Sequence, residues 1–266
     1  MTSRNCEGAE NLNNILLQRL LLERQSKNSG GIYHLTQIKL AYNSNHIEGT
    51  RLTEDETRSL YETRSILPDG KSAYRLDDMV VTANHFRAFD YILNHALDEI
   101  SEAAIKEIHG ILFTGTAAMQ DADFAIGGYK RFPNIIGAGI ETAEPEDVPA
   151  AMRALISQYR AHADTSVESI IDFHARFEKI HPFQDGNGRV GRLLMFKECL
   201  RIGVTPILIF DDMKEFYYRG LKMYPQEPGW LTDTCLSGQD RYGAYCKHLL
   251  PRLSLSPEDQ MDGPEL

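Results

Sequence analysis

Cysteine is scarce in this chain of 266 residues. The four cysteines, Cys6, Cys199, Cys235 and Cys246, are far apart and form no CxxC pair. A zinc knuckle needs closely spaced cysteines and a disulfide scaffold needs many of them, so the sequence argues against both. We therefore expect a reducing compartment and predict a cytoplasmic protein.

The sequence also lacks a long apolar run and an excess of basic residues. No stretch is long and apolar enough to predict a membrane-spanning helix, and residues 1–14 lack the basic start and apolar stretch of a signal peptide. The 38 acidic and 28 basic residues give a net charge of -10, which argues against a nonspecific nucleic-acid surface or a polybasic membrane anchor. A hydrophobic content of 42% predicts a globular enzyme with a full core.

What is abundant is helical periodicity, which runs through most of the chain. Capping signals place several helix starts: Thr53 with Glu56, Ser101, and Thr165 with Glu168. The expected helices cover about 12–28, 33–42, a stretch after 53, 77–96, a stretch after 101, one with Pro149 in its first turn, one from 165 to 180, and 189–203.

Other segments break this pattern. Residues 68–70 predict a loop, and residues 127–139 predict a small hairpin or extended flap. The apolar run 205–210 fits either a strand or a buried helix, and the last dozen residues predict a frayed tail.

Residues 181–192 read HPFQDGNGRVGR and carry most of the chemistry. A neutral imidazole can accept a proton, a carboxylate can bind Mg²⁺, and glycines let backbone amides approach an anion. Two arginines can neutralise the remaining negative charge. The stretch is therefore typical of a phosphate-handling site.

Two other interpretations fit parts of this stretch. GNGRVG also fits the dinucleotide fingerprint GxGxxG, with Asp211 about twenty residues further on. That fingerprint needs a buried strand before its first glycine, whereas the preceding residues are charged and follow a helix. A metal hydrolase would use His174, His181 and Asp185, but Pro182 interrupts the helix that they would share and no HExxH spacing is present.

The stretch resembles the HxFx[D/E]GNGRxxR signature of the Fic family at every defining position. Residues 44–49, SNHIEG, are similar to the inhibitory helix [S/T]xxxE[G/N] that class II members carry before the core. The resemblance spans about residues 37–225. It implies an all-α Fic fold, a helical bundle with a small β-hairpin flap. It divides the chain into an N-terminal helical region at 1–75 with the inhibitory helix near 37–50, a core at 76–225, and a C-terminal helix and tail at 226–266.

The resemblance implies a nucleotidyltransferase that moves AMP from ATP to a Ser, Thr or Tyr hydroxyl of a target protein, with Mg²⁺. His181 would be the general base and Asp185 the metal ligand. Phe183 would anchor the core. The implied nucleotide-binding residues are Gly186, Asn187, Gly188, Arg189, Arg192, Tyr217 and Tyr218. The two glycines would shape an anion hole with Asn187 as a side-chain donor, and the tyrosines would either wall an adenine pocket or pack in the core.

Inhibition and target binding follow from the same resemblance. Glu48 would pair with Arg192 and so block the γ-phosphate site. Ser44 would either bond toward the active site or act as an ordinary helix cap. The flap would align a target segment by main-chain pairing. The flap residues implied to bind the target are Gly128, Tyr129, Lys130 and Arg131.

Several alternatives stay open at the level of sequence. Similar scaffolds move UMP, phosphate or phosphocholine, and some remove AMP with the inhibitory glutamate. A non-enzyme, in which Glu48 keeps a nucleotide-sensing site closed, is an alternative of another class. The expected partners are ATP, a target protein and, by the resemblance, a second copy of the chain; neither a membrane nor direct nucleic-acid binding is expected.

Overall fold

The computed structural model of the protein describes residues 4–66, 74–136, 140–161 and 165–249. These residues form ten α-helices, two short 3-10 helices and one two-stranded sheet, which confirms the predicted all-α class. The helices are α1 (Arg4–Ser26), α2 (Ile32–Ile47), α3 (Glu54–Thr63), α4 (Leu76–Asn94), α5 (Glu102–Phe113), α6 (Val148–Ala161), α7 (Val167–Ile180), α8 (Asn187–Arg201), α9 (Lys214–Met223) and α10 (Pro228–Leu249), with η1 (Ala117–Gln120) and η2 (Asp211–Met213) between them.

Side-chain caps start several helices where the sequence predicts them. Thr53 and Glu56 form a reciprocal capping box at α3, and the Ser101 hydroxyl accepts the Ala104 N–H at the start of α5. The box predicted from Thr165 and Glu168 for α7 is wrong by one position. Ser166 is the N-cap and pairs with Ser169 three residues later, since a serine hydroxyl there can both accept and donate.

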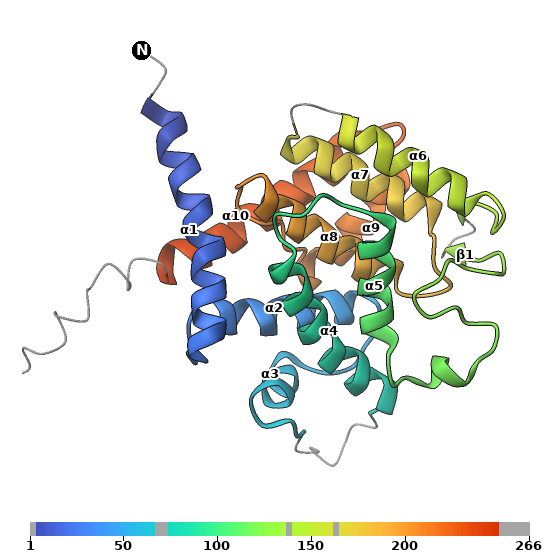
Figure 1. Cartoon of the computed structure of the whole chain (residues 1–266), viewed down its shortest axis with the longest axis horizontal. Helices are drawn as coiled ribbons and strands as arrows, with labels where there is room; N and C mark the ends of the chain where they lie inside the picture. The colour runs from blue at the N-terminus through green and yellow to red at the C-terminus, as the bar shows by residue number, and fades with distance from the viewer. Residues whose placement is uncertain (1–3, 67–73, 137–139, 162–164, 250–266) are drawn as a thin grey trace, which may run out of the picture.

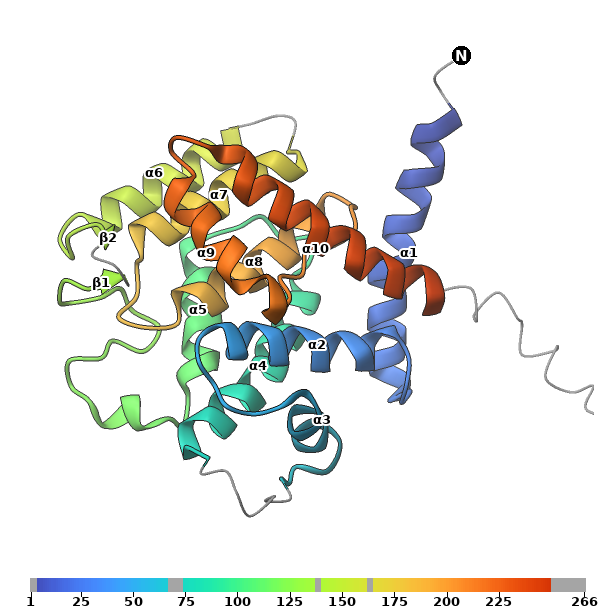
Figure 2. The same ribbon diagram turned by 180° about the vertical axis from the view of Figure 1, so that it is seen from behind.

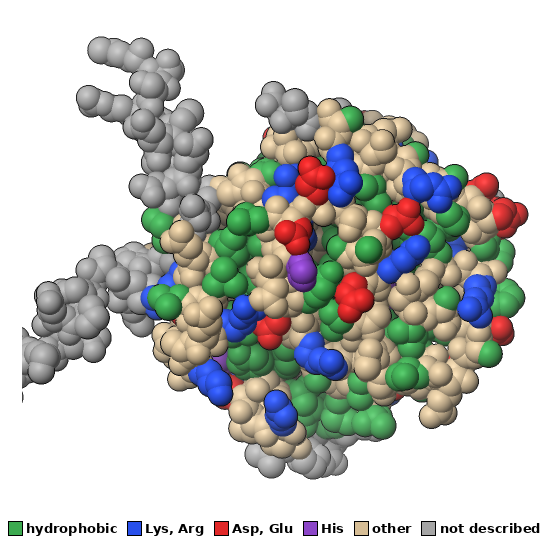
Figure 3. Space-filling view, viewed as in Figure 1, with side chains coloured by type: hydrophobic (Ala, Val, Ile, Leu, Met, Phe, Trp, Pro, Cys, Tyr) green, Lys and Arg blue, Asp and Glu red, His purple; other side chains and the backbone are tan. Residues whose placement is uncertain are grey.

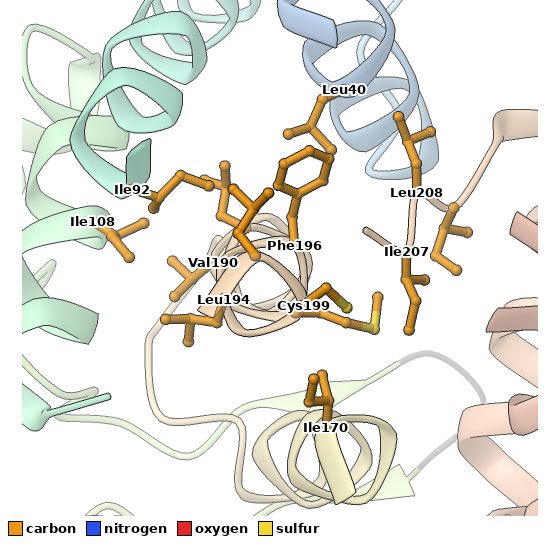
Figure 4. Close-up of a cluster of buried hydrophobic side chains, with 14 of the residues drawn as sticks. Leu40, Ile92, Ile108, Ile170, Val190, Leu194, Phe196, Cys199, Ile207 and Leu208 are labelled. Carbon is orange, nitrogen blue, oxygen red and sulfur yellow. The ribbon is translucent and has the colours of Figure 1, made fainter. Parts of the chain in front are cut away.

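Helix α8 forms the centre of the molecule and is buried on every side. All residues from Asn187 to Leu200 are buried. Figure 4 looks down this helix and shows Leu40 of α2, Ile92 of α4, Ile108 of α5 and Ile170 of α7 arranged around it. Figure 1 shows the same helix behind α4 and α5 and beside α9. Polar side chains on α8 are therefore enclosed by protein.

Helix α2 lies across this core, between α3 and α10 (Figure 2). It continues to Ile47, five residues beyond the predicted end near Tyr42, because its last turn is also buried. The start of α2 is held by Glu23 of α1, which accepts the Tyr33 N–H at 2.8 Å. A Cβ on Gly31 would overlap this carboxylate, so glycine permits the close approach of the two helices.

Residues 205–210 form neither the strand nor the helix that the sequence left open. The run is irregular, and Ile207, Leu208, Ile209 and Phe210 are buried against α10. One of its backbone groups is bonded from α10: Gln239 donates to the Thr205 carbonyl at 2.6 Å. Hydrophobicity therefore predicted the burial of the run but not its conformation.

The predicted hairpin is present between α5 and α6. Strand β1 (Ile135–Ile136) pairs antiparallel with β2 (Ile140–Glu141), with Ile136 opposite Ile140. Residues 127–134 before β1 follow an irregular path along one edge of the molecule (Figure 1). The loop predicted at 68–70 and the tail predicted for the last dozen residues lie outside the described residues.

The surface carries charges of both signs. On the face that Figure 3 shows, acidic and basic side chains are interspersed with apolar ones. None of the helices in the described part of the chain has the length and apolarity that crossing a bilayer requires.

Candidate active site

The loop between α7 and α8 begins with an unusual backbone conformation. His181 caps the end of α7 with φ of 53°, in the left-handed region that residues other than glycine rarely adopt. Its N–H donates to the Phe177 carbonyl at 2.9 Å. Gly186, with φ of 82°, closes the loop and starts α8. Such backbone outliers persist where the surroundings hold them, and they concentrate at functional sites.

The loop is held from inside by two buried side chains. Phe183 is 0% exposed and its ring stacks on His109, with centroids 4.0 Å apart. Asn187 accepts the Phe183 N–H at 2.8 Å and donates to the Phe183 carbonyl at 2.9 Å. Both polar atoms of the Asn187 side chain thus serve the loop. The role of Asn187 toward a bound anion stays a prediction, while the core role expected of Phe183 agrees with its burial.

The N-terminus of α8 faces a carboxylate. A Cβ on Gly186 would overlap the Phe113 ring, and one on Gly188 would overlap the carboxylate of Glu48. The first N–H groups of a helix have no partner within it, and together with the helix dipole they favour an anion. The Glu48 carboxylate, directly after α2, therefore lies at the position where the first N–H groups of α8 would bind a phosphate.

Arg192 makes the second contact to that carboxylate. Its Nη2 lies 2.7 Å from Glu48 Oε1 and also donates to the Ser44 carbonyl at 2.8 Å. Its Nε donates to the Ser44 hydroxyl at 3.1 Å. Burial by itself would lower the pKa of Arg192, but the attraction of the Glu48 carboxylate outweighs it and the pKa rises. The guanidinium is thus charged and engaged by residues of α2.

Arg189 and Asp185 pair one turn earlier. Arg189 Nη2 lies 3.1 Å from each carboxylate oxygen of Asp185. The Arg189 side chain is buried, whereas that of Asp185 is 59% exposed. Both line a cavity of about 210 Å³ that also reaches Glu48, Thr50 and the first turn of α4. The cavity therefore brings Arg189 together with carboxylates from two other parts of the chain, Glu48 and the first turn of α4.

His181 is neutral near pH 7. Burial lowers its pKa to about 4, although a backbone contact with Glu178 opposes the decrease and the Lys130 charge adds to it. Its Nδ1 has no hydrogen-bond partner among the described residues. A neutral imidazole with a free nitrogen is the form that can accept a proton.

A second buried group of polar side chains lies behind Arg192. The Tyr217 ring lies 5.7 Å from the guanidinium, and its hydroxyl lies 2.7 Å from His174 Nε2. Burial lowers the pKa of His174 to about 3 and raises that of Glu178 to about 8, although the Arg192 charge opposes the latter change. Burial therefore favours the uncharged form of all three side chains, and the charged groups beside them are Arg192 and its partner Glu48.

The two tyrosines predicted beside the nucleotide have different environments. Tyr217 is 0% exposed, so the structure places it in the core and not on an accessible adenine pocket. Its hydroxyl needs a buried partner, and His174 provides one. Tyr218 is 38% exposed and donates to the Ile47 carbonyl at 3.1 Å. It therefore joins α9 to the end of α2.

The predicted flap residues lie beside the loop. Lys130 donates its backbone N–H to the Pro182 carbonyl at 2.8 Å. Its ammonium group is buried and bonds Asn134 Oδ1 at 2.6 Å and Thr142 Oγ1 at 2.7 Å. Arg131 is exposed and donates to the Ala122 carbonyl. The Lys130 side chain thus braces the flap, and its backbone fixes the flap against the loop between α7 and α8.

Tyr129 and Gly128 complete this part of the flap. The Tyr129 hydroxyl donates to Glu102 at 2.8 Å, and its ring approaches Phe183 with centroids 5.9 Å apart. Gly128 follows directly after Gly127, whose φ is 68°. A glycine turn therefore opens this part of the flap, and Tyr129 ties it to α5.

Sequence reasoning missed His109, Glu178 and the pairing of Tyr217 with His174. His109 and Glu178 sit among apolar residues of α5 and α7, so helical periodicity presents them as part of a core face. Their partners are more than forty positions away or in another element, as in the 43-residue separation of His174 and Tyr217. A short motif carries no signal for such contacts.

Fold and site together define a class of protein: an all-α domain in which a histidine-bearing glycine loop opens a buried central helix, with a glutamate from an earlier helix held against it. Residues 99–199 match the Fic/DOC family, and the chain therefore carries a domain of this family. Protein adenylyltransferase Fic of Nematostella vectensis is 31% identical over 181 residues, which are 66% of this chain and 40% of that protein. The Drosophila erecta protein of the same name is 33% identical over 185 residues, 68% of this chain and 36% of the relative.

The chain thus spans 40% or less of the length of these curated relatives. Among solved structures, a Fic domain containing signaling protein from Bacteroides thetaiotaomicron is 27% identical with a TM-score of 0.65, over 89% of this chain and 92% of that one. Fic-1 from C. elegans has a TM-score of 0.68 over 94% of this chain and 76% of that one, at 19% identity, which speaks for the fold alone.

Proposed function

We propose that this protein is an autoinhibited protein adenylyltransferase that transfers AMP from ATP to a hydroxyl group of a target protein. The observation that carries the proposal is the Glu48 carboxylate, held by Arg192 at 2.7 Å against the N-terminus of α8. An anion already lies at the donors that the phosphates of ATP need, close to a histidine that is neutral at pH 7. Relatives named Protein adenylyltransferase Fic support the same activity.

In the proposed reaction the target hydroxyl oxygen attacks the α-phosphorus of ATP. The new O–P bond forms as the bond from the α-phosphorus to the bridging oxygen breaks, and pyrophosphate leaves. His181 accepts the hydroxyl proton, which its lowered pKa permits throughout the neutral range. Arg189, Arg192 and the backbone N–H group of Gly188 hold the phosphates and stabilise charge as it moves to the leaving group, while Gly186 shapes the turn that opens α8.

Mg²⁺ fits this site through one protein carboxylate. Among the described residues no group of three or more His, Cys, Asp or Glu side chains is placed to hold a metal by itself. Mg²⁺ is commonly held by one or two carboxylates together with substrate phosphates, and the exposed oxygens of Asp185 at the cavity suit this arrangement. Mg²⁺ bound in this way would neutralise charge on the polyphosphate.

Autoinhibition follows from competition for Arg192. The guanidinium that would bind the γ-phosphate is occupied by Glu48 and by two oxygens of Ser44. Productive binding of ATP requires the Glu48 carboxylate to leave, because two anions cannot share these donors without repulsion. In the absence of a release signal, we expect the wild-type chain to be nearly silent.

The flap would align the target beside His181. Gly128, Tyr129 and Arg131 are proposed to contact it, with Lys130 bracing the flap from behind. Tyr218 is the exposed aromatic residue proposed beside the adenine. The three-part division at residues 75 and 225, the homodimer and the cytoplasmic location remain predictions.

Intact-mass spectrometry after incubation with Mg-ATP tests the proposal. We expect a mass increase of one AMP unit in Glu48→Gly but little in the wild type, because the substitution frees Arg192. The double variant Glu48→Gly/His181→Ala should lose the adduct, since removal of a positioned base lowers a rate by about a hundred- to ten-thousand-fold. Adduct formation at the same rate in the double variant would reject His181 as the base.

Two further outcomes distinguish the alternatives. If Glu48→Gly binds Mg-ATP but forms no adduct, a purified AMP-modified protein should be supplied as substrate to both Glu48→Gly and the wild type. Release of AMP by the wild type but not by Glu48→Gly would replace the proposal with AMP removal, in which the Glu48 carboxylate takes part. Binding of ATP with neither reaction would favour a nucleotide sensor.

A further inference from the structure

His109 is a buried histidine of α5 that the proposed reaction does not use. It is 0% exposed and lies parallel to Phe183 at 4.0 Å and to Phe124 at 5.9 Å between ring centroids. Stacking alone would be served as well by phenylalanine. A histidine at this position therefore needs another explanation.

Both ring nitrogens of His109 have defined partners, and these partners set the tautomer. The Gly127 N–H donates to Nδ1 at 2.9 Å, so Nδ1 carries no proton. Nε2 lies 3.2 Å from the Asp185 carbonyl oxygen, which can only accept, so Nε2 carries the proton. A single neutral form satisfies both bonds, and burial lowers the pKa of His109 to about 4.

These bonds join two parts of the proposed site. Gly127 starts the flap with φ of 68°, and Asp185 belongs to the catalytic loop, 58 positions later in the chain. Two further contacts connect the same segments: the Lys130 N–H to the Pro182 carbonyl at 2.8 Å, and Asn134 Nδ2 to the Phe183 carbonyl at 3.0 Å. Of these contacts, only the two made by His109 join both segments to a third element, α5.

The Asp185 carbonyl is an effective place for such a bond. The Asp185 carboxylate already accepts from the Gly186 N–H at 2.5 Å and from Arg189. The Asp185 carbonyl and the Gly186 N–H belong to the same peptide unit. The bond from His109 to this carbonyl fixes the orientation of that peptide unit, and with it the orientation of the Asp185 carboxylate that accepts the N–H. On the flap side, the bond to Gly127 fixes the turn from which the target-binding residues continue.

We propose that His109 is a positioning residue that couples the flap to the catalytic loop through its neutral Nε2–H tautomer. The inference rests on the proposed function for its effect on catalysis, because His109 touches neither nucleotide nor target. Its loss should leave Arg192 in place, because His109 contacts neither Arg192 nor its partners, and should uncouple target alignment from the orientation of the Asp185 carboxylate. Nucleotide affinity should therefore change less than the transfer rate.

The test uses the full chain in the Glu48→Gly background. His109→Phe keeps the ring and its stacking but removes both hydrogen bonds. His109→Gln restores one donor and one acceptor on a shorter planar group. The matched control is His85→Phe, since His85 is also fully buried but neither of its nitrogens has a hydrogen-bond partner among the described residues.

Hydrogen–deuterium exchange is the readout that does not depend on activity. In His109→Phe we expect faster exchange in both the flap peptide 125–134 and the loop peptide 181–188, with α10 unchanged. His109→Gln should return part of the protection, and His85→Phe should resemble its parent in both peptides. Unchanged exchange in either peptide of His109→Phe, or equal loosening by His85→Phe, would overturn the proposal.

Kinetics give the second readout. Self-modification by Mg-ATP should be slower by about ten- to a hundred-fold in His109→Phe, the usual cost of losing the partner that orients a metal-binding group. The Kd for Mg-ATP should stay within about twofold, because hydrogen bonds to the phosphates remain. A weaker Kd with an unchanged rate would contradict the coupling. A silent Glu48→Gly parent would count against the proposed activity, and the exchange result would then decide on His109.

Discussion

Arg192 is held by three hydrogen bonds that differ in kind. One joins it to the charged Glu48, one to the Ser44 carbonyl, and one to the Ser44 hydroxyl. Only the last depends on the identity of the side chain at position 44. The sequence left Ser44 open between this role and an ordinary cap, and the structure places its hydroxyl on Arg192. A serine one turn before the glutamate therefore adds directly to the closing contact.

Ser44→Ala should weaken the closed state without abolishing it. A hydrogen bond to a charged group contributes about 1.5 kcal/mol, so the open fraction should rise about tenfold. We expect self-modification by Mg-ATP to increase by at most that factor and to remain below that of Glu48→Gly. Ser237→Ala, at an exposed serine of α10, should behave as wild type. An activity of Ser44→Ala at or below that of wild type would show that the hydroxyl does not support closure.

At the scale of elements, two glycines of α10, Gly238 and Gly243, differ in how closely other parts of the chain approach them. A Cβ on Gly238 would overlap the Leu208 carbonyl oxygen of the irregular run 205–210. A Cβ on Gly243 would meet only the Thr205 methyl group, at an ordinary 3.5 Å. The first glycine permits close packing of backbone on backbone, whereas the second costs helix stability without a packing need.

Gly238→Ala and Gly243→Ala should therefore change stability in opposite directions. We expect Gly238→Ala to lower the free energy of unfolding by about 1–3 kcal/mol, as overpacking against backbone does. Gly243→Ala should raise it by up to about 1 kcal/mol, the helix propensity of alanine over glycine. Urea unfolding followed by circular dichroism measures both values. Destabilisation by both variants would show that the close approach is not specific to position 238.

Elements with local signals were predictable from the sequence, and elements fixed by distant partners were not. The Thr53 and Glu56 box lies within one turn, so the sequence located it correctly. The true extent of α2 depends on burial of its last turn by other helices, which no local pattern records. The motif at 181–192 predicted which residue types gather at the site. It could not show that Asn187 serves the loop, since its partner Phe183 is reached only through the turn.

At the scale of the whole molecule, loss of hydration keeps four histidines of the described residues neutral. Burial lowers the pKa values of His85 and His174 to about 3 and those of His109 and His181 to about 4. In the unfolded chain each would titrate near about 6.5. Their contribution to stability is therefore complete above that pH and is lost as the pH falls toward the folded values. Glu178, with a pKa raised to about 8, acts in the opposite direction.

We therefore expect stability to rise with pH between about 4.5 and 6.5. Four histidines take up protons on unfolding in this range, against release by Glu178 and by Asp90, whose pKa burial also raises. Each net proton corresponds to a slope of about 1.4 kcal/mol per pH unit. Urea unfolding at several pH values measures the slope, and His85→Phe should reduce it by about one proton. A slope of zero, or one unchanged by His85→Phe, would contradict the assignment.

The burial of Arg192 also determines how the closed state responds to dissolved salt. Its side chain is 3% exposed, so mobile ions cannot reach the charge that holds Glu48, whereas exposed pairs such as Arg241 with Asp212 are open to them. Screening weakens exposed pairs and leaves buried ones nearly unchanged. Changes in ionic strength should therefore leave the pair of Arg192 and Glu48 intact and the proposed closed state unchanged. An event that displaces the end of α2, and Glu48 with it, is needed to release the guanidinium.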